Sequence, residues 1–312
     1  MLPPAVRRWT HVLVGIAVLV LLAAALSASS MLAFRGAPVP AGAWAGPPHS
    51  LDAYRGLGTW VSIYDRRAWA DPEAAVADMA GHGVHTLFIQ TGNSNSKGVV
   101  YNPVGQETFI RAAHARGMKI VAWYLPEMVD MARDYDRIAQ AIGLRTIDGQ
   151  GFDSFALDIE STKIRSIDAR NAALAELTVM LRSLVGDAYT LGAIVPSPVG
   201  IAKATGFWDD FPYGTVARDF DVLLPMGYYT YHGKGAAAAA ADVTESVNII
   251  RWQEGGAPVP IHFIGGLSAK TTPAEVKAFS DATVSTGCIG ASLYSWSGTS
   301  AGAWESLQSV VR

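Results

Sequence analysis

Apolar and polar positions follow a repeating order along the chain from residue 51 onward. Short runs of β-branched or aromatic residues, typical of buried strands, alternate with longer Ala-rich segments that have helical spacing. Eight strands are predicted, over 58–64, 84–90, 119–124, 154–159, 189–195, 222–226, 260–264 and 289–294. Eight helices are predicted to follow them, over 72–82, 105–116, 131–142, 168–185, 211–218, 236–252, 273–285 and 301–311.

Two helix starts are marked by capping residues. Asp71-Pro72 and Thr272-Pro273 each place a capping side chain before a proline, the order that helix N-termini prefer. Eight βα units within residues 51–312 match the size of a closed (β/α)₈ TIM barrel, whereas a doubly wound sheet would rarely need so many strands. We therefore predict an α/β protein whose residues 51–312 form one barrel domain.

The N-terminal residues have a different character. Residues 9–34 contain no Lys, Arg, Asp or Glu, and Arg7 and Arg8 precede them. A run of this length suits a helix that crosses a hydrocarbon core of about 30 Å, with the positive flank in the cytoplasm. Residues 1–34 are thus predicted to be a membrane anchor or a cleaved signal peptide, and the length of the run favours the anchor. Residues 35–50, rich in Pro, Gly and Ala, are predicted to be a spacer, so the barrel is expected outside the cytoplasm.

Composition and charge narrow the function classes. Apolar residues make up 50% of the chain and charged residues 16%, which excludes a disordered protein. The single cysteine, Cys288, excludes an internal disulfide framework. All 27 acidic residues but only 21 of the 24 basic residues lie after position 50, which gives that part a net charge of −6. Nucleic acid is therefore not an expected partner.

The fourth predicted strand carries two carboxylates near its end. Because side chains alternate along a strand, Ala156, Asp158 and Glu160 share one side, and the apolar residues between them share the other. The apolar side belongs against the helices, which leaves both carboxylates facing the barrel lumen at its mouth, where active sites of such barrels lie. Crowding of two carboxyls raises one pKa, and a protonated carboxyl can donate to a glycosidic leaving group. Glu160 is the predicted proton donor; the alternative is a salt bridge, for example to Lys163 or Arg165, or a cation site.

The same strand resembles a known family. Asp153, Asp158 and Glu160 match the D-x-x-D-x-D-x-E signature of family-18, chitinase-like glycoside hydrolases, whereas Ala156 replaces the middle Asp. Met226-Gly227-Tyr228 is similar to that family's M-x-Y, and Trp296 is similar to its floor tryptophan. The resemblance implies that Glu160 protonates the leaving oxygen, that Asp158 orients a reacting 2-acetamido group and that Tyr228 donates a hydrogen bond to it. The loss of the middle Asp removes a residue that this substrate-assisted step uses.

A second resemblance involves another carboxylate. The Asp-x-Glu of strand four together with Asp65, at the end of strand one, is similar to family-25 lysozymes, which cleave bacterial cell wall. Further candidates to bind substrate follow the other strands, because sugars suit aromatic planes bordered by amides and carboxylates. They are Gln90, Asn93, Tyr124, Glu127, Tyr229 and Trp296.

The predicted function is hydrolysis of glycosidic bonds in an extracellular polysaccharide, such as a cell-wall glycan or peptidoglycan. No metal or cofactor is expected, since no dinucleotide fingerprint or phosphate-binding loop occurs and the nearby His82 and His85 fall on the opposite face of the barrel. The alternative function is a non-catalytic carbohydrate-binding barrel, which the replacement by Ala156 makes credible.

Overall fold

Eight parallel strands form one sheet in the computed structural model, which describes residues 49–203, 206–253 and 259–311. The strands are β1 (Gly56–Val61), β2 (Thr86–Asn93), β3 (Lys119–Leu125), β4 (Ser154–Asp158), β5 (Leu191–Val195), β6 (Val222–Pro225), β7 (His262–Leu267) and β8 (Gly290–Tyr294). Each overlaps one of the eight strands predicted from the sequence.

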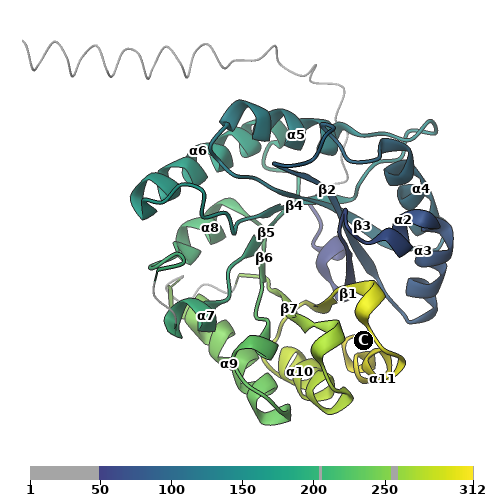
Figure 1. Ribbon diagram of the computed structural model, residues 1–312, viewed down its shortest axis with the longest axis vertical. Coiled ribbons are helices and arrows are strands. Elements are labelled where there is room, and N and C mark those ends of the chain that lie inside the picture. Colours follow the sequence, from purple (N-terminus) through teal and green to yellow (C-terminus); the bar gives the residue numbers. More distant parts are fainter. Residues whose placement is uncertain (1–48, 204–205, 254–258, 312) are drawn as a thin grey trace, which may run out of the picture. The chain divides into compact units, whose positions relative to one another are not determined.

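The sheet closes into a barrel. Its order runs β6-β5-β4-β3-β2-β1-β8-β7, and two single parallel bridges, Leu223 to Ile261 and Met226 to Ile264, join β6 to β7. The helices surround the strands (Figure 1). The prediction of a (β/α)₈ barrel is therefore confirmed, and all βα loops open on the C-terminal face.

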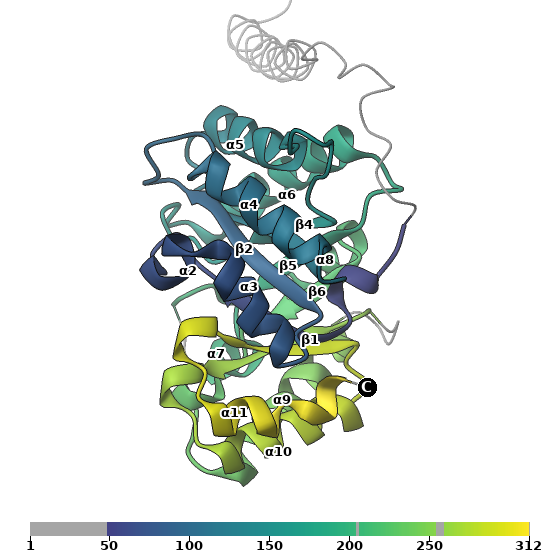
Figure 2. The same ribbon diagram turned by 90° about the vertical axis from the view of Figure 1, so that its right-hand side faces the viewer.

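The helices follow the predicted bounds closely. They are α2 (Arg66–Ala70), α3 (Pro72–Gly81), α4 (Pro103–His114), α5 (Met131–Gly143), α6 (Ile167–Val185), α7 (Pro198–Lys203), α8 (Tyr213–Asp219), α9 (Ala236–Gln253), α10 (Pro273–Ser285) and α11 (Ala301–Ser306). Both predicted caps form: the side chains of Asp71 and Thr272 accept hydrogen bonds from Ala74 N and Glu275 N. Figure 2 shows α9, α10 and α11 side by side along one flank of the barrel.

The prediction from the sequence missed several short helices. The sequence pattern did not reveal α2, α7 or the 3₁₀ helices η1 (Asp52–Tyr54), η2 (Tyr229–Tyr231), η3 (Ser268–Lys270) and η4 (Trp296–Gly298). The last predicted helix divides into α11 and η5 (Gln308–Val311). Elements of three to six residues are too short for a helical period to show.

A tyrosine closes the barrel at the end opposite the mouth. Tyr54 is fully buried, and its hydroxyl donates to Phe155 O at 3.0 Å and lies 2.7 Å from Ser154 Oγ. His262, on β7, contacts Tyr54 O through Nδ1 at 2.8 Å. The residues that lead into β1 are thus fastened to both sides of the barrel.

The predicted anchor or signal, residues 1–34, lies outside the described residues, as does the spacer up to residue 48. In the described ranges, no helix has both the length and the apolar character required to cross a membrane.

Candidate active site

Strand β4 brings Asp158 and Glu160 to the mouth of the barrel. Ala156 belongs to the apolar cluster that fills the lumen, while Phe155, Leu157 and Ile159 are fully buried on the other side of the strand. Ile159 N continues the ladder by donating to Ile194 O at 2.8 Å, so the alternation extends beyond the last residue of β4. Asp158 therefore lies above Ala156, with a relative exposure of 5%, and the half-buried Glu160 follows it outward.

The environment disfavours ionisation of these two carboxyls. Burial raises the pKa of Asp158 well above 3.8, and the nearby charge of Glu160 raises it further. Burial also raises the pKa of Glu160. Among the described residues neither carboxyl forms a salt bridge, and Asp158 Oδ1 is buried without a hydrogen-bond partner. Lys163, one of the cations considered from the sequence, instead lies 3.7 Å from Glu127.

Two tyrosines face the carboxyl pair. Tyr228 follows β6 and packs against the lumen cluster, and its pKa is raised by burial and then by the charges of Asp158 and Glu160. Tyr294, the last residue of β8, packs against the same cluster. Burial, together with the charges of Asp158, Glu160 and Asp65, raises its pKa, whereas the nearby Ser62 side chain lowers it in part. The site thus unites side chains from β4, β6 and β8 around two carboxyls.

An aromatic layer lies beneath. Trp60 on β1 stacks on Phe88 of β2 at 4.4 Å and meets Trp123 of β3 edge-on at 5.9 Å. Trp60 Nε1 donates to Ser292 Oγ at 2.8 Å, whereas Trp123 Nε1 is buried without a partner among the described residues. Trp60 and Ser62 were not predicted as site residues, although they lie two positions apart and so share one side of the predicted strand 58–64.

Gln90 and Asn93 organise the backbone around the mouth. Gln90 is 3% exposed; its Oε1 accepts from Ile63 N at 3.1 Å and its Nε2 donates to Gly92 O at 3.4 Å. Asn93 Oδ1 accepts from Asn95 N at 2.9 Å, and its Nδ2 donates to the Tyr64 hydroxyl at 3.0 Å. These contacts assign both side chains to holding the loops after β1 and β2.

Asp65 and Glu127 lie on the rim. Asp65 precedes α2 and accepts from Ala68 N at 3.2 Å through Oδ1, while its Oδ2 is buried and has no partner in the described part of the chain. Glu127 follows β3, and its ion pair with Lys163 links the loops after β3 and β4. The charge of Asp65 contributes to the raised pKa of Tyr294, one of the two tyrosines beside the carboxyl pair.

Three candidates point away from the lumen. Tyr124 is fully buried and donates its hydroxyl hydrogen to Asp134 of α5 at 2.6 Å, because its neighbour Trp123 takes the lumen side of β3. Tyr229 is 1% exposed, with its ring 5.9 Å from that of Phe279 on α10. The expectation that these tyrosines bind substrate was wrong.

Trp296 is the third candidate whose side chain points away from the lumen. Its Nε1 donates to Asp78 of α3 at 2.8 Å, and the Arg67 guanidinium lies 4.7 Å from its ring centroid. Trp296 belongs to η4 rather than to β8, so the alternation of the strand does not extend to it. Tyr294 takes the lumen position instead.

Asp153, the first residue of the fourth-strand motif, lies at the other end of the barrel. It accepts from Ile120 N at 2.9 Å and lies 2.9 Å from His114 Nε2 and 3.3 Å from Lys119 Nζ. Burial opposes ionisation, but these partners outweigh it and lower the pKa of Asp153. Asp153 therefore fastens β4 to β3 and α4.

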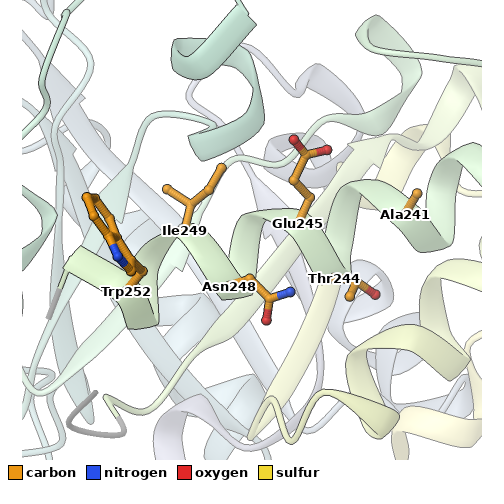
Figure 3. A pocket seen from close by; sticks show the side chains of 6 residues that line it. All are labelled: Ala241, Thr244, Glu245, Asn248, Ile249 and Trp252. Carbon is orange, nitrogen blue, oxygen red and sulfur yellow. The ribbon is translucent and has the colours of Figure 1, made fainter. Parts of the chain in front are cut away.

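The described residues hold no group of three or more His, Cys, Asp or Glu side chains that could bind a metal ion. A hollow of about 500 Å³ lies on α9 (Figure 3) and is lined by Ala241, Thr244, Glu245, Asn248, Ile249 and Trp252. These residues all come from one helix, and none of them belongs to the carboxyl site.

Comparison with known proteins supports the fold. No protein-family model and no curated protein matches the sequence. A chitinase from Chromobacterium violaceum superposes with a TM-score of 0.60 at 11% identity, over 82% of this chain and 99% of that one. An endo-β-1,4-mannanase from Thermotoga petrophila gives 0.59 at 10% identity, over 78% and 68%. The Bacillus cereus spore cortex-lytic enzyme gives 0.58 at 10% identity, over 82% and 74%. The chain is similar to these structures in its barrel fold.

Proposed function

We propose that the barrel hydrolyses glycosidic bonds, with Glu160 as general acid and Asp158 as its partner. One observation carries the proposal: two carboxyls stand on the lumen side of β4, their pKa values are raised, and no ion pair in the described residues neutralises them. A carboxyl that keeps its proton near neutral pH can protonate the oxygen of a leaving sugar. The fold shared with a chitinase and a mannanase agrees with this chemistry.

Each residue has a separate role in the proposed reaction. Glu160, the more exposed carboxyl, is placed to donate its proton to the glycosidic oxygen. Asp158 lies deeper, and its unpartnered Oδ1 is available to accept a hydrogen bond from substrate or to stabilise positive charge that develops on the sugar. The Tyr228 hydroxyl can donate to a substrate oxygen beside Asp158. Ala156 provides no carboxyl below Asp158, so Asp158 must act without a partner from that position.

The second candidate function is carbohydrate binding without turnover. Ala156 favours it, because the family-18 pattern has an Asp at this position and a protein that had lost catalysis could dispense with it. Both candidates use the same mouth, so only measured hydrolysis separates them.

We further propose that the barrel acts outside the cytoplasm, carried there by residues 1–34. The uncharged run over residues 9–34 and the preceding Arg7 and Arg8 support this location. Polysaccharides available there, among them chitin-like polymers, mannans and peptidoglycan, are the proposed substrates.

The test is a hydrolysis assay with the full-length protein in mild detergent. Hexamers of N-acetylglucosamine and of mannose, together with purified peptidoglycan, are incubated with wild type, Glu160→Gln and Glu176→Gln, and products are separated by chromatography. Glu176 is exposed on α6 and provides the matched control. We expect products from wild type and from Glu176→Gln, and a rate of hydrolysis lower by about 10²-fold or more in Glu160→Gln. Binding without products from wild type would instead support the carbohydrate-binding function.

A further inference from the structure

Two of the most exposed aromatic side chains lie at the mouth of the barrel. Tyr64 has a relative exposure of 69% and Tyr231 one of 63%. Tyr64 follows β1 and Tyr231 lies in η2 after β6, so both stand on the C-terminal face with the carboxyl pair. The strands that they follow, β1 and β6, are not neighbours in the barrel.

Neighbouring side chains hold both rings in place. The Tyr64 hydroxyl accepts a hydrogen bond from Asn93 Nδ2 at 3.0 Å, and Tyr64 N donates to Ser62 Oγ at 3.3 Å. The Tyr231 ring meets that of Tyr228 at a centroid distance of 6.2 Å, and Lys270 Nζ lies 5.2 Å from its centroid. Exposed rings that are already positioned can bind a ligand without a large loss of side-chain entropy.

The exposed rings connect through the carboxyl site. Ser62, which bonds Tyr64 N, follows β1, and the ring of Trp60 on β1 lies 6.5 Å from that of Tyr294. Tyr294 and Tyr228 both pack against the lumen cluster below the carboxyl pair, and the Tyr228 ring in turn contacts that of Tyr231. Four tyrosines therefore form a row across the mouth, Tyr64 and Tyr231 at its ends and the carboxyls beside its middle.

We propose that this tyrosine row binds several consecutive sugar units of a glycan chain, with Tyr64 and Tyr231 as outer subsites on opposite sides of the bond to be cleaved. The inference rests on the proposed function. The flat C–H face of a sugar packs on an aromatic ring, and hydroxyls at its edge accept hydrogen bonds from an amine such as that of Lys270. Because chain extends on both sides of the carboxyls, the enzyme cleaves within a chain rather than at its end.

The test compares kcat/KM on oligosaccharides from disaccharide to hexasaccharide of whichever sugar is hydrolysed. Tyr64→Ala and Tyr231→Ala are each expected to lower kcat/KM on the hexasaccharide about tenfold or more and to change it little on the disaccharide. Tyr231→Phe keeps the ring and should restore most of the hexasaccharide activity. Trp252→Ala removes an exposed aromatic side chain on α9, 81% exposed, and is the control expected to behave as wild type. Equal losses on both lengths, no loss in the tyrosine variants, or the same loss in Trp252→Ala would overturn the inference.

A binding measurement separates this inference from the proposed function. In the Glu160→Gln background, calorimetry with chitohexaose, mannohexaose and their dimers should show tighter binding of one hexamer than of its dimer, and Tyr231→Ala should remove that difference. If wild type hydrolyses nothing but this difference is found, the proposed function fails and the tyrosine row stands. If hydrolysis occurs but affinity does not depend on chain length or on Tyr231, the proposed function stands and the inference that the tyrosine row binds the glycan chain is wrong. Absence of both hydrolysis and binding overturns both.

Discussion

The charge of Glu160 disfavours ionisation of Asp158, two residues below it on the same side of β4. Asp158 is 5% exposed and its Oδ1 has no hydrogen-bond partner within the described residues. A carboxyl in such a place reduces stability whenever it is charged, because neither water nor a cation compensates the charge. Its presence is easier to explain by chemistry than by folding.

Replacing Asp158 by Asn should therefore stabilise the protein. Folding raises the pKa of this carboxyl, so the protonated side chain favours the folded state. This stabilisation is fully present below pH 3.8, the ordinary pKa, and is lost as the pH rises through the pKa of the folded protein. The Asn variant lacks this loss, so its melting temperature at pH 7 should exceed that of wild type by about 2 °C or more, which corresponds to roughly 1 kcal/mol in a domain of this size. The difference should vanish near pH 3 in a calorimetric series, and a variant less stable than wild type at pH 7 would contradict it.

Asp153 on the same strand should respond in the opposite direction. Asp153→Asn places an amide N–H beside Lys119 Nζ or Ile120 N, which already donate, so the free energy of unfolding should fall by about 1 to 3 kcal/mol. Asp153 stabilises the folded protein above pH 3.8, because folding lowers its pKa. His114 stabilises it below pH 6.5, because the hydrogen bond to Asp153 raises the pKa of His114. The loss, measured by urea unfolding, should thus be largest between these two values; an unchanged midpoint would show that the contacts contribute nothing.

Tyr124→Phe should affect stability and leave hydrolysis intact. The substitution removes the 2.6 Å hydrogen bond to the buried side chain of Asp134, which still accepts a 2.8 Å bond from Met128 N. A loss of about 1 to 3 kcal/mol is expected from a buried charged acceptor that loses a donor. Unfolding and kinetics measured on the same preparation test both parts, and a changed KM with unchanged stability would return Tyr124 to the substrate site.

Arg137 should control the order of the loop after β2. This buried arginine on α5 donates to Ser96 O at 2.6 Å and to Asn93 O, while the more exposed Arg133 makes one bond, to Ser94 O at 3.1 Å. Arg137→Gln should raise amide hydrogen exchange over residues 93–101 about tenfold or more, because the carbonyls of Asn93 and Ser96 lose this donor. Arg133→Gln provides the control, with a smaller increase; equal increases would mean that the loop does not depend on burial of Arg137.

The sequence predicted the parts of this molecule that depend on periodicity. Strand β4 alternates small or acidic residues with large apolar ones, so the sequence alone predicts which side carries Asp158 and Glu160. Strand β3 offers no such contrast, because Trp123 and Tyr124 are both large aromatics, and only the position of Asp134 on α5 shows which one faces out. Trp296 was misassigned because β8 ends at Tyr294 and alternation stops where a strand stops. Contacts between distant loops, such as Asn93 with Tyr64, leave no mark in a local pattern.

The most direct test of the central claim compares two leaving groups in wild type and Glu160→Gln. A general acid is needed when the leaving sugar is a poor leaving group and is hardly needed when a dinitrophenolate departs. We expect Glu160→Gln to lower kcat/KM on the natural oligosaccharide by about 10² to 10⁴ and on the dinitrophenyl glycoside of the same sugar by less than about tenfold. Equal losses on both substrates, or none on either, would show that Glu160 does not donate the proton.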